Sequence, residues 1–153
     1  MASQYDLYQI SQIAITMSGV DASRHVPDEY WTSCVEPAMA ENLKDFYAHR
    51  DQVSVSAFID DYSKCLISFG IRGVGSQKLM KQTCALYQEN LKDVNPRSLE
   101  NFLFFIDRCA RTTDVRDAIA AAIHLIEDND WAPKMRDHLL ILSLIQRFEI
   151  PAK

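Results

Sequence analysis

The sequence is poor in glycine, and its few glycines lie in the first half of the chain. All four, in 153 residues, precede Ser76. Glycine inside a helix costs about 1 kcal/mol relative to alanine, so a long glycine-free stretch favours helices. Two of the three prolines in this stretch, Pro96 and Pro133, stand where a first helical turn accepts them. We therefore expect helices from Ser76 onward.

Cysteine pairs are also missing. Cys34, Cys65, Cys84 and Cys109 are widely separated and form no C-x-x-C motif, which speaks against a zinc ribbon and against paired disulfides. We expect reduced thiols, as in the cytosol or the mitochondrial matrix. Because free cysteine is among the most buried residue types, we expect most of them in the core.

Long apolar runs and an excess of positive charge are absent as well. The longest apolar run near the N-terminus, Ile13–Met17, is interrupted by Thr16 and is too short for a membrane span. The formal net charge is −5, which disfavours nucleic acid as a partner. Residues 1–20 contain no Lys or Arg, unlike an Arg-rich mitochondrial presequence. An organellar form would therefore need a removed, internal or unusual signal.

Motifs of catalysis are not recognisable. Gly70–Ser76 resembles a phosphate-binding loop, but Ser76 and Gln77 stand where the Walker pattern requires lysine. The four histidines are scattered, without His-x₃-His or His-Glu-x-x-His spacing, and no Gly-x-Ser-x-Gly elbow occurs. His124, between two apolar residues of an expected helix, is interpreted as structural. We predict neither an enzyme nor a cofactor or metal site.

Helical periodicity, by contrast, is strong, most clearly over residues 97–148. Asn95-Pro96, Thr112-Thr113-Asp114 and Asp130-Trp131-Ala132-Pro133 are typical openers of three helices. Short connections between them favour antiparallel neighbours. The expected core residues of these helices are Leu103, Ile106, Ile119, Ile123, Leu139 and Leu142. Phe102, Phe104 and Phe105 are assigned to the core as well, Phe104 with a partner surface as the alternative.

The first half of the chain also reads as helical. Helices are expected over residues 5–17, 54–69 and 76–91, and residues 28–31 and 36–48 are expected to form one or two further helices. Residues 53–58 alternate like a strand, but the longer window fits the helical period. Helix starts put successive hairpins about 35–43 residues apart. This predicts an all-α fold of six to eight helices in an antiparallel helical-hairpin stack, right-handed and solenoid-like. Residues 1–53 form an N-terminal helical extension and residues 54–153 the hairpin domain.

One segment resembles a known family. Residues 107–114, with Ala118 and Ile119, are similar to the matching part of cytochrome c oxidase subunit Va. There, a helix ends in a cysteine flanked by arginines; a two-residue break, an Asp, and a helix with Ala and a branched apolar residue follow. The resemblance extends through Asn95–Arg97 and Trp131–Lys134 and covers about residues 76–148.

The resemblance implies a non-catalytic accessory subunit of respiratory complex IV. Such a subunit is peripheral on the matrix face of the mitochondrial inner membrane and holds no haem, copper or zinc. It packs against the catalytic core and a nuclear-encoded neighbour, and it binds no nucleic acid. Two alternatives remain open: a pentatricopeptide-like RNA-binding protein, which needs base-reading residues and a basic groove, and a soluble tetratricopeptide-type scaffold, which binds a short peptide.

Three residues are candidates for a partner interface. Trp131 stands beside polar residues at an expected helix start, and Arg111 and Arg116 flank the preceding connection. Trp and Arg dominate binding hot spots. The alternatives are local: an indole beside a helix start often packs as a staple, and arginines in a last turn favourably meet the helix dipole.

Overall fold

The computed structural model describes residues 6–17 and 26–151, and this part of the chain is all-α, as predicted. Its seven α-helices are α1 (Leu7–Met17), α3 (Glu36–Ala48), α4 (Val55–Arg72), α5 (Gln77–Glu89), α6 (Pro96–Cys109), α7 (Arg116–Asp128) and α8 (His138–Arg147). A π-helical turn, Trp31–Val35, precedes α3, and short 3₁₀ turns join several helices. Residues 53–58 form no strand, because Ser54 caps α4 by accepting the Ala57 N–H.

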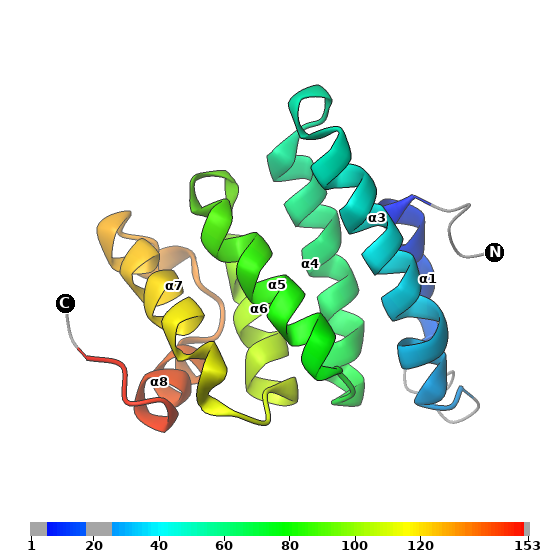
Figure 1. The fold of residues 1–153 in the computed structure, drawn as a ribbon. Coiled ribbons are helices and arrows are strands. Elements are labelled where there is room, and N and C mark those ends of the chain that lie inside the picture. Colours follow the sequence, from blue (N-terminus) through cyan, green and yellow to red (C-terminus); the bar gives the residue numbers. More distant parts are fainter. Residues whose placement is uncertain (1–5, 18–25, 152–153) are drawn as a thin grey trace.

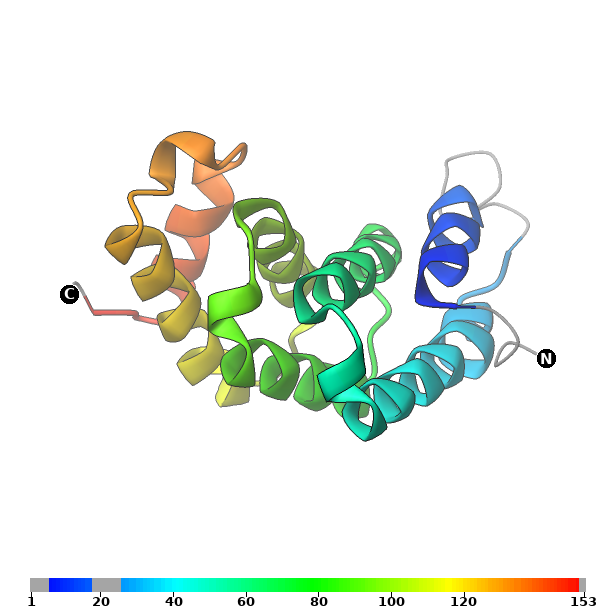
Figure 2. The ribbon, with the colours of Figure 1, turned by 90° about the horizontal axis from the view of Figure 1, so that it is seen from above.

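The helices form two layers, with α1, α4 and α6 side by side in one and α3, α5 and α7 in the other (Figures 1 and 2). Along the chain, α3 to α7 alternate in direction (Figure 1). In the first layer, hereafter the inner layer, α4 packs against both α1 and α6. None of the described helices is long and apolar enough to cross a membrane.

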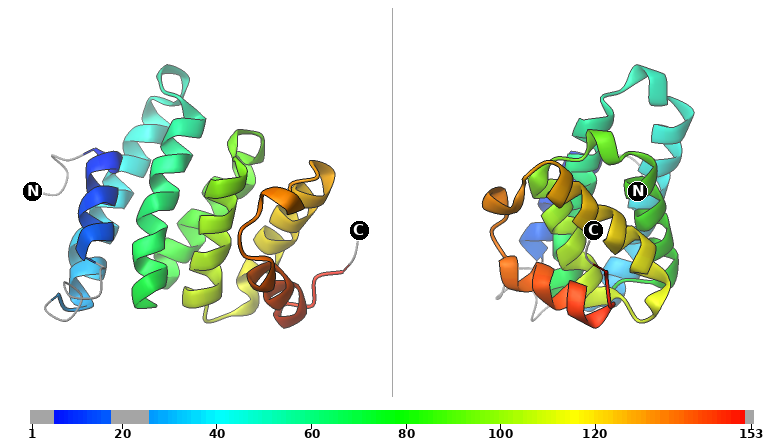
Figure 3. Two further views of the ribbon diagram at one scale, coloured as in Figure 1. Left: turned by 180° about the vertical axis from the view of Figure 1, so that it is seen from behind. Right: turned by 90° about the vertical axis from the view of Figure 1, so that its left-hand side faces the viewer.

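The last helix breaks this alternation. α8 lies across the end of its neighbours instead of running along them (Figures 1 and 3). Its C-terminal Arg147 donates to the carbonyl oxygens of Asp107 and Ala110 at the end of α6, over 3.1 and 3.2 Å. α8 thus closes one end of the helical array.

The predicted start of the third C-terminal helix, at residues 130–133, is wrong. Ala132–Lys134 forms only a 3₁₀ turn, and the backbone of Met135 is extended, with φ −81° and ψ 139°. The true cap is Asp137, whose carboxylate accepts the Leu140 N–H over 3.0 Å. α8 therefore begins at His138.

The predicted core is right for α6 and α7 and wrong for α8. Leu103, Ile106, Ile119 and Ile123 are buried, together with Phe102 and Phe105, whereas Phe104 is half-buried against the core. Leu139 and Leu142 are 79% and 59% exposed. Leu140 and Leu144 occupy the core positions instead. Nearly every residue from 139 to 145 is apolar, so the pattern does not tell which face is buried.

The same positions are buried in successive helices. The helices of the second layer, α3, α5 and α7, are hereafter the outer helices. They bury residues about 40 positions apart, one from each helix in turn: Ala38, Leu79 and Ala118; Met39, Met80 and Ile119; Phe46, Tyr87 and Ile126. The inner helices α4 and α6 repeat in the same way: Ile59 and Leu99; Tyr62 and Phe102; Leu66 and Ile106. The pattern of buried positions therefore recurs along the chain, although the sequence shows no recurring residue signature.

Candidate functional site

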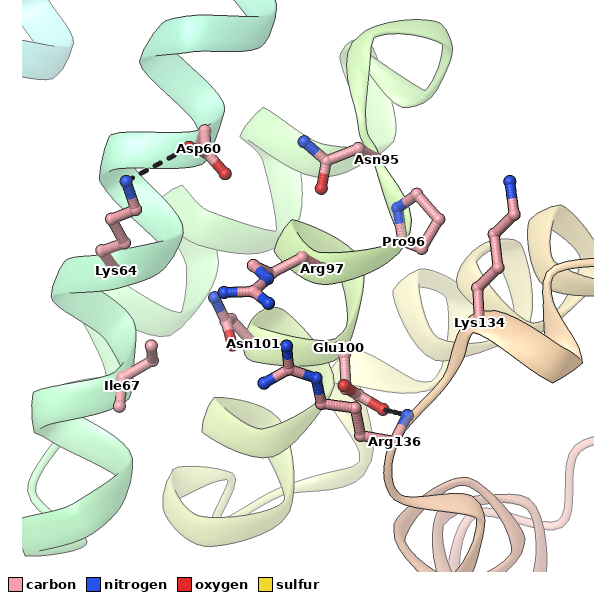
Figure 4. A pocket seen from close by; sticks show the side chains of 10 residues that line it. All are labelled: Asp60, Lys64, Ile67, Asn95, Pro96, Arg97, Glu100, Asn101, Lys134 and Arg136. Atoms are coloured by element: carbon pink, nitrogen blue, oxygen red, sulfur yellow. Dashed lines mark hydrogen bonds and ion pairs between the residues drawn. The ribbon is translucent and has the colours of Figure 1, made fainter.

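A polar groove of about 540 Å³ opens where α4, the start of α6 and residues 132–136 meet (Figure 4). We call it the α4–α6 groove. Its lining residues are Asp60, Lys64, Ile67, Asn95, Pro96, Arg97, Glu100, Asn101, Lys134 and Arg136. The start of α6 is fixed by a capping box, in which Asn95 Oδ1 accepts the Ser98 N–H over 2.9 Å and Ser98 Oγ accepts the Asn95 N–H over 3.2 Å.

Glu100 joins two walls of this groove. One carboxylate oxygen, Oε2, accepts the backbone N–H groups of Arg136 and Asp137 over 2.6 and 2.9 Å. The carboxylate thereby anchors the segment before α8 on α6. As a result, the side chains of Arg136 and Arg97 project into the same space from two different elements (Figure 4).

The groove carries an excess of positive charge. Lys64 pairs with Asp60 over 3.3 Å and, outside the groove lining, with Asp61 over 3.9 Å. The guanidinium groups of Arg97 and Arg136 and the ammonium group of Lys134 have no ion-pair or hydrogen-bonding partner in the described part of the chain. In a chain of net charge −5, these are concentrated, uncompensated cations.

Other arginines of the inner layer, by contrast, serve the fold. Arg72 donates to the Val26 carbonyl and to Asp28, each over 2.6 Å. Arg108 donates to the Gly70 carbonyl over 3.2 Å. Together with Arg147, they tie the C-terminal end of an inner helix to the segment beside it.

The predicted interface residues do not converge on one site. Arg111 and Arg116 are exposed and donate to the carbonyl oxygens of Gly73 and Glu149, over 3.1 and 2.8 Å. Trp131 is half-buried and packs against the core. Arg116 begins α7 and Trp131 follows its end, so they lie roughly 20 Å apart at 1.5 Å of rise per residue.

The loop that resembles a phosphate-binding loop holds a carboxylate instead. Glu36 accepts the Ser76 N–H over 2.9 Å through Oε1 and the Ser76 hydroxyl over 2.8 Å through Oε2. Gly73, with φ +69°, ends α4 in the left-handed conformation that glycine adopts without strain. The glycines and Ser76 thus end one helix and begin the next.

The four cysteines differ in exposure, and none of them belongs to a metal-binding cluster in the described residues. In the part of the chain that the structure describes, no three His, Cys, Asp or Glu residues gather as a metal site would require. Cys65 and Cys109 are buried, Cys84 is half-buried and Cys34 is exposed. Burial raises the pKa of the Cys84 and Cys109 thiols to about 11, so both are protonated, weak nucleophiles at neutral pH.

Sequence reasoning missed the groove, although one signal for it was present. Arg97 lies in the first turn of α6, and Lys134 and Arg136 lie just before α8. Cations are unfavourable at helix N-termini, because the helix dipole is positive there. Basic residues at the starts of both α6 and α8 are therefore a pattern that fold stability alone does not favour.

Comparison of the chain with protein-family models, curated proteins and solved structures finds no significant match. Its function is therefore inferred from the geometry of the described residues.

Proposed function

We propose that this chain is a non-catalytic binding subunit, built as a right-handed, solenoid-like stack of antiparallel helical hairpins. The observation that carries the proposal is the recurrence of the same buried positions about every 40 residues. In such repeats each unit packs on its neighbours, and the stack leaves an extended face for a partner. The α4–α6 groove lies on the inner layer and is the natural place for that partner.

The assembly we propose is cytochrome c oxidase, where the chain would act as a peripheral accessory subunit on the matrix side of the inner membrane. The resemblance to subunit Va over residues 76–148 supports this choice. Its most specific segment is the junction of α6 and α7, where Cys109 is buried and Arg108 and Arg111 donate to carbonyls at the end of α4. The partners would be the catalytic core and a nuclear-encoded neighbour.

RNA binding is the second candidate, and the uncompensated cations of the groove favour it. Proteins that bind single-stranded RNA usually stack bases on aromatic side chains. None of the described residues that line the groove is aromatic, and the net charge of −5 opposes a polyanion. A protein partner therefore stands ahead of RNA.

The test is affinity purification of the full-length tagged chain from its own cells, combined with a native gel of mitochondrial membranes. We expect the chain in the oxidase-activity band, in near-equimolar amounts with other subunits. Recovery with a different protein assembly would support a role as a binding subunit but refute the assignment to cytochrome c oxidase. A complex lost on RNase treatment would favour the second candidate, and a chain recovered alone would refute the proposal.

A further inference from the structure

Two guanidinium groups share the α4–α6 groove, and neither forms an ion pair with any residue that the structure describes. Arg97 comes from the start of α6 and Arg136 from the segment before α8, and both are exposed. Glu100, one of the two carboxylates of the lining, accepts two backbone N–H groups through Oε2 and forms no ion pair among the described residues. Asp60, the other carboxylate of the lining, pairs with Lys64. Within residues 6–17 and 26–151, neither guanidinium group is thus held by an ion pair.

We propose that the α4–α6 groove binds an acidic peptide segment of a partner protein, with Arg97 and Arg136 pairing its carboxylates. This inference rests on the proposed function, in that the chain holds a partner, and it names the chemistry by which the partner is held. The planar fork of an arginine side chain matches a carboxylate with two parallel hydrogen bonds. Two arginines from different elements therefore suit two acidic residues of one peptide.

The rest of the lining fits a peptide as well. The Asn95 side-chain amide N–H groups donate to no acceptor in the described part of the chain, and Lys134 adds a further charge at the rim. Asn amides bond readily to peptide carbonyls, which the main chain of a bound segment presents. Ile67 and Pro96 offer apolar surface, and about 540 Å³ accommodates several side chains.

A nucleic acid fits less well. The groove includes the carboxylates of Asp60 and Glu100, which repel a continuous phosphate backbone. Its described lining contains no aromatic side chain on which a base could stack. An acidic peptide carries its charges on side chains that can be placed at the two arginines while its backbone passes the carboxylates.

The experiment uses fluorescence anisotropy with the purified full-length chain and a fluorescein-labelled hexaglutamate peptide. Labelled hexaglutamine and a labelled oligouridine serve as the neutral and the nucleic-acid probes. The test variant is the double substitution R97Q/R136Q. The matched control is K44Q/K81Q, which removes the same charge from exposed lysines on the outer helices α3 and α5. Circular dichroism checks that both variants keep their helices.

We expect wild-type chain to bind hexaglutamate and not hexaglutamine. Binding should weaken about tenfold in R97Q/R136Q, as for the loss of charge-assisted hydrogen bonds, and stay within about twofold in K44Q/K81Q. Equal weakening in both variants, or no binding of hexaglutamate, would overturn the inference. If the chain binds oligouridine through the two arginines and does not bind hexaglutamate, the groove is an RNA site and not a peptide site. Failure here with the chain still held in a protein assembly overturns only this inference, not the proposed function.

Discussion

At the scale of single residues, the buried and exposed leucines of α8 offer a matched pair. Leu144 is fully buried, whereas Leu139 is 79% exposed. Leu144→Ala should lower the free energy of unfolding by about 2–5 kcal/mol, through lost burial and a residual cavity. Leu139→Ala should change it by less than about 0.5 kcal/mol. Urea denaturation measures both, and a larger loss for Leu139→Ala would mean that α8 is turned the other way.

The four thiols should differ sharply in reactivity. Cys34 is exposed, whereas Cys65 and Cys109 are buried. Burial raises the pKa of Cys84 to about 11, so its thiolate fraction at pH 7 is small and grows about tenfold per pH unit. We expect iodoacetamide to label Cys34 first and Cys84 slowly, faster at pH 9 than at pH 7. Mass spectrometry of tryptic peptides follows the order, and early labelling of Cys65 would contradict the packing of α1 on α4.

Glu100 should position Arg136 in the groove. Its substitution therefore distinguishes binding by the placement of Arg136 from binding by net positive charge alone. Its carboxylate anchors the backbone of Arg136 and Asp137. Glu100→Ala makes the groove more positive, so attraction by net charge alone would tighten hexaglutamate binding. If the placement of Arg136 matters, binding should instead weaken several-fold, on the order of one lost charge-assisted contact. Anisotropy titrations with hexaglutamate show whether Glu100→Ala tightens or weakens binding.

Among the helices, the sequence predicts the start correctly where a capping side chain is followed directly by an apolar stripe. Ser54, Ser76 and Asn95 are capping residues followed by a clear apolar stripe, and each caps a helix in the structure. The start of α8 was predicted wrongly because residues 130–133 have the composition of a helix N-terminus. The residue that caps the helix, Asp137, lies further along the chain. Local sequence cannot choose between two such starts, since the choice depends on the contact of Glu100 with the Arg136 and Asp137 backbone.

The end of α4 provides a test of these local rules. Gly73 adopts φ +69° and its N–H bonds to the Phe69 carbonyl over 2.7 Å. Gly73→Ala should destabilise the protein by about 1–2 kcal/mol, the cost of a left-handed conformation for a residue with a β-carbon. Gly73→Asn should cost less, because asparagine tolerates this conformation better. Thermal unfolding compares the two, and equal stability of all three proteins would contradict the cap.

At the scale of the whole molecule, the hairpin order is readable from the sequence but the groove is not. Helix spacing of about 40 residues is a property of the linear chain. The groove needs Lys64, Arg97 and Arg136, from three separate segments, to meet. Their meeting depends on how α8 crosses the array, which no local pattern encodes. The predicted set of Arg111, Arg116 and Trp131 follows from residue type and from positions beside expected helix ends, but Arg116 and Trp131 lie at opposite ends of α7.

Lysine cross-linking of the affinity-purified assembly shows whether a partner is held at the α4–α6 groove. Lys134 lies at the groove, whereas Lys44 and Lys81 are exposed on the outer helices α3 and α5. We predict that mass spectrometry finds cross-links to another protein at Lys134 and few at Lys44 and Lys81. Cross-links concentrated on Lys44 and Lys81, with none at Lys134, would mean that the partner is held by the outer helices and not at the groove.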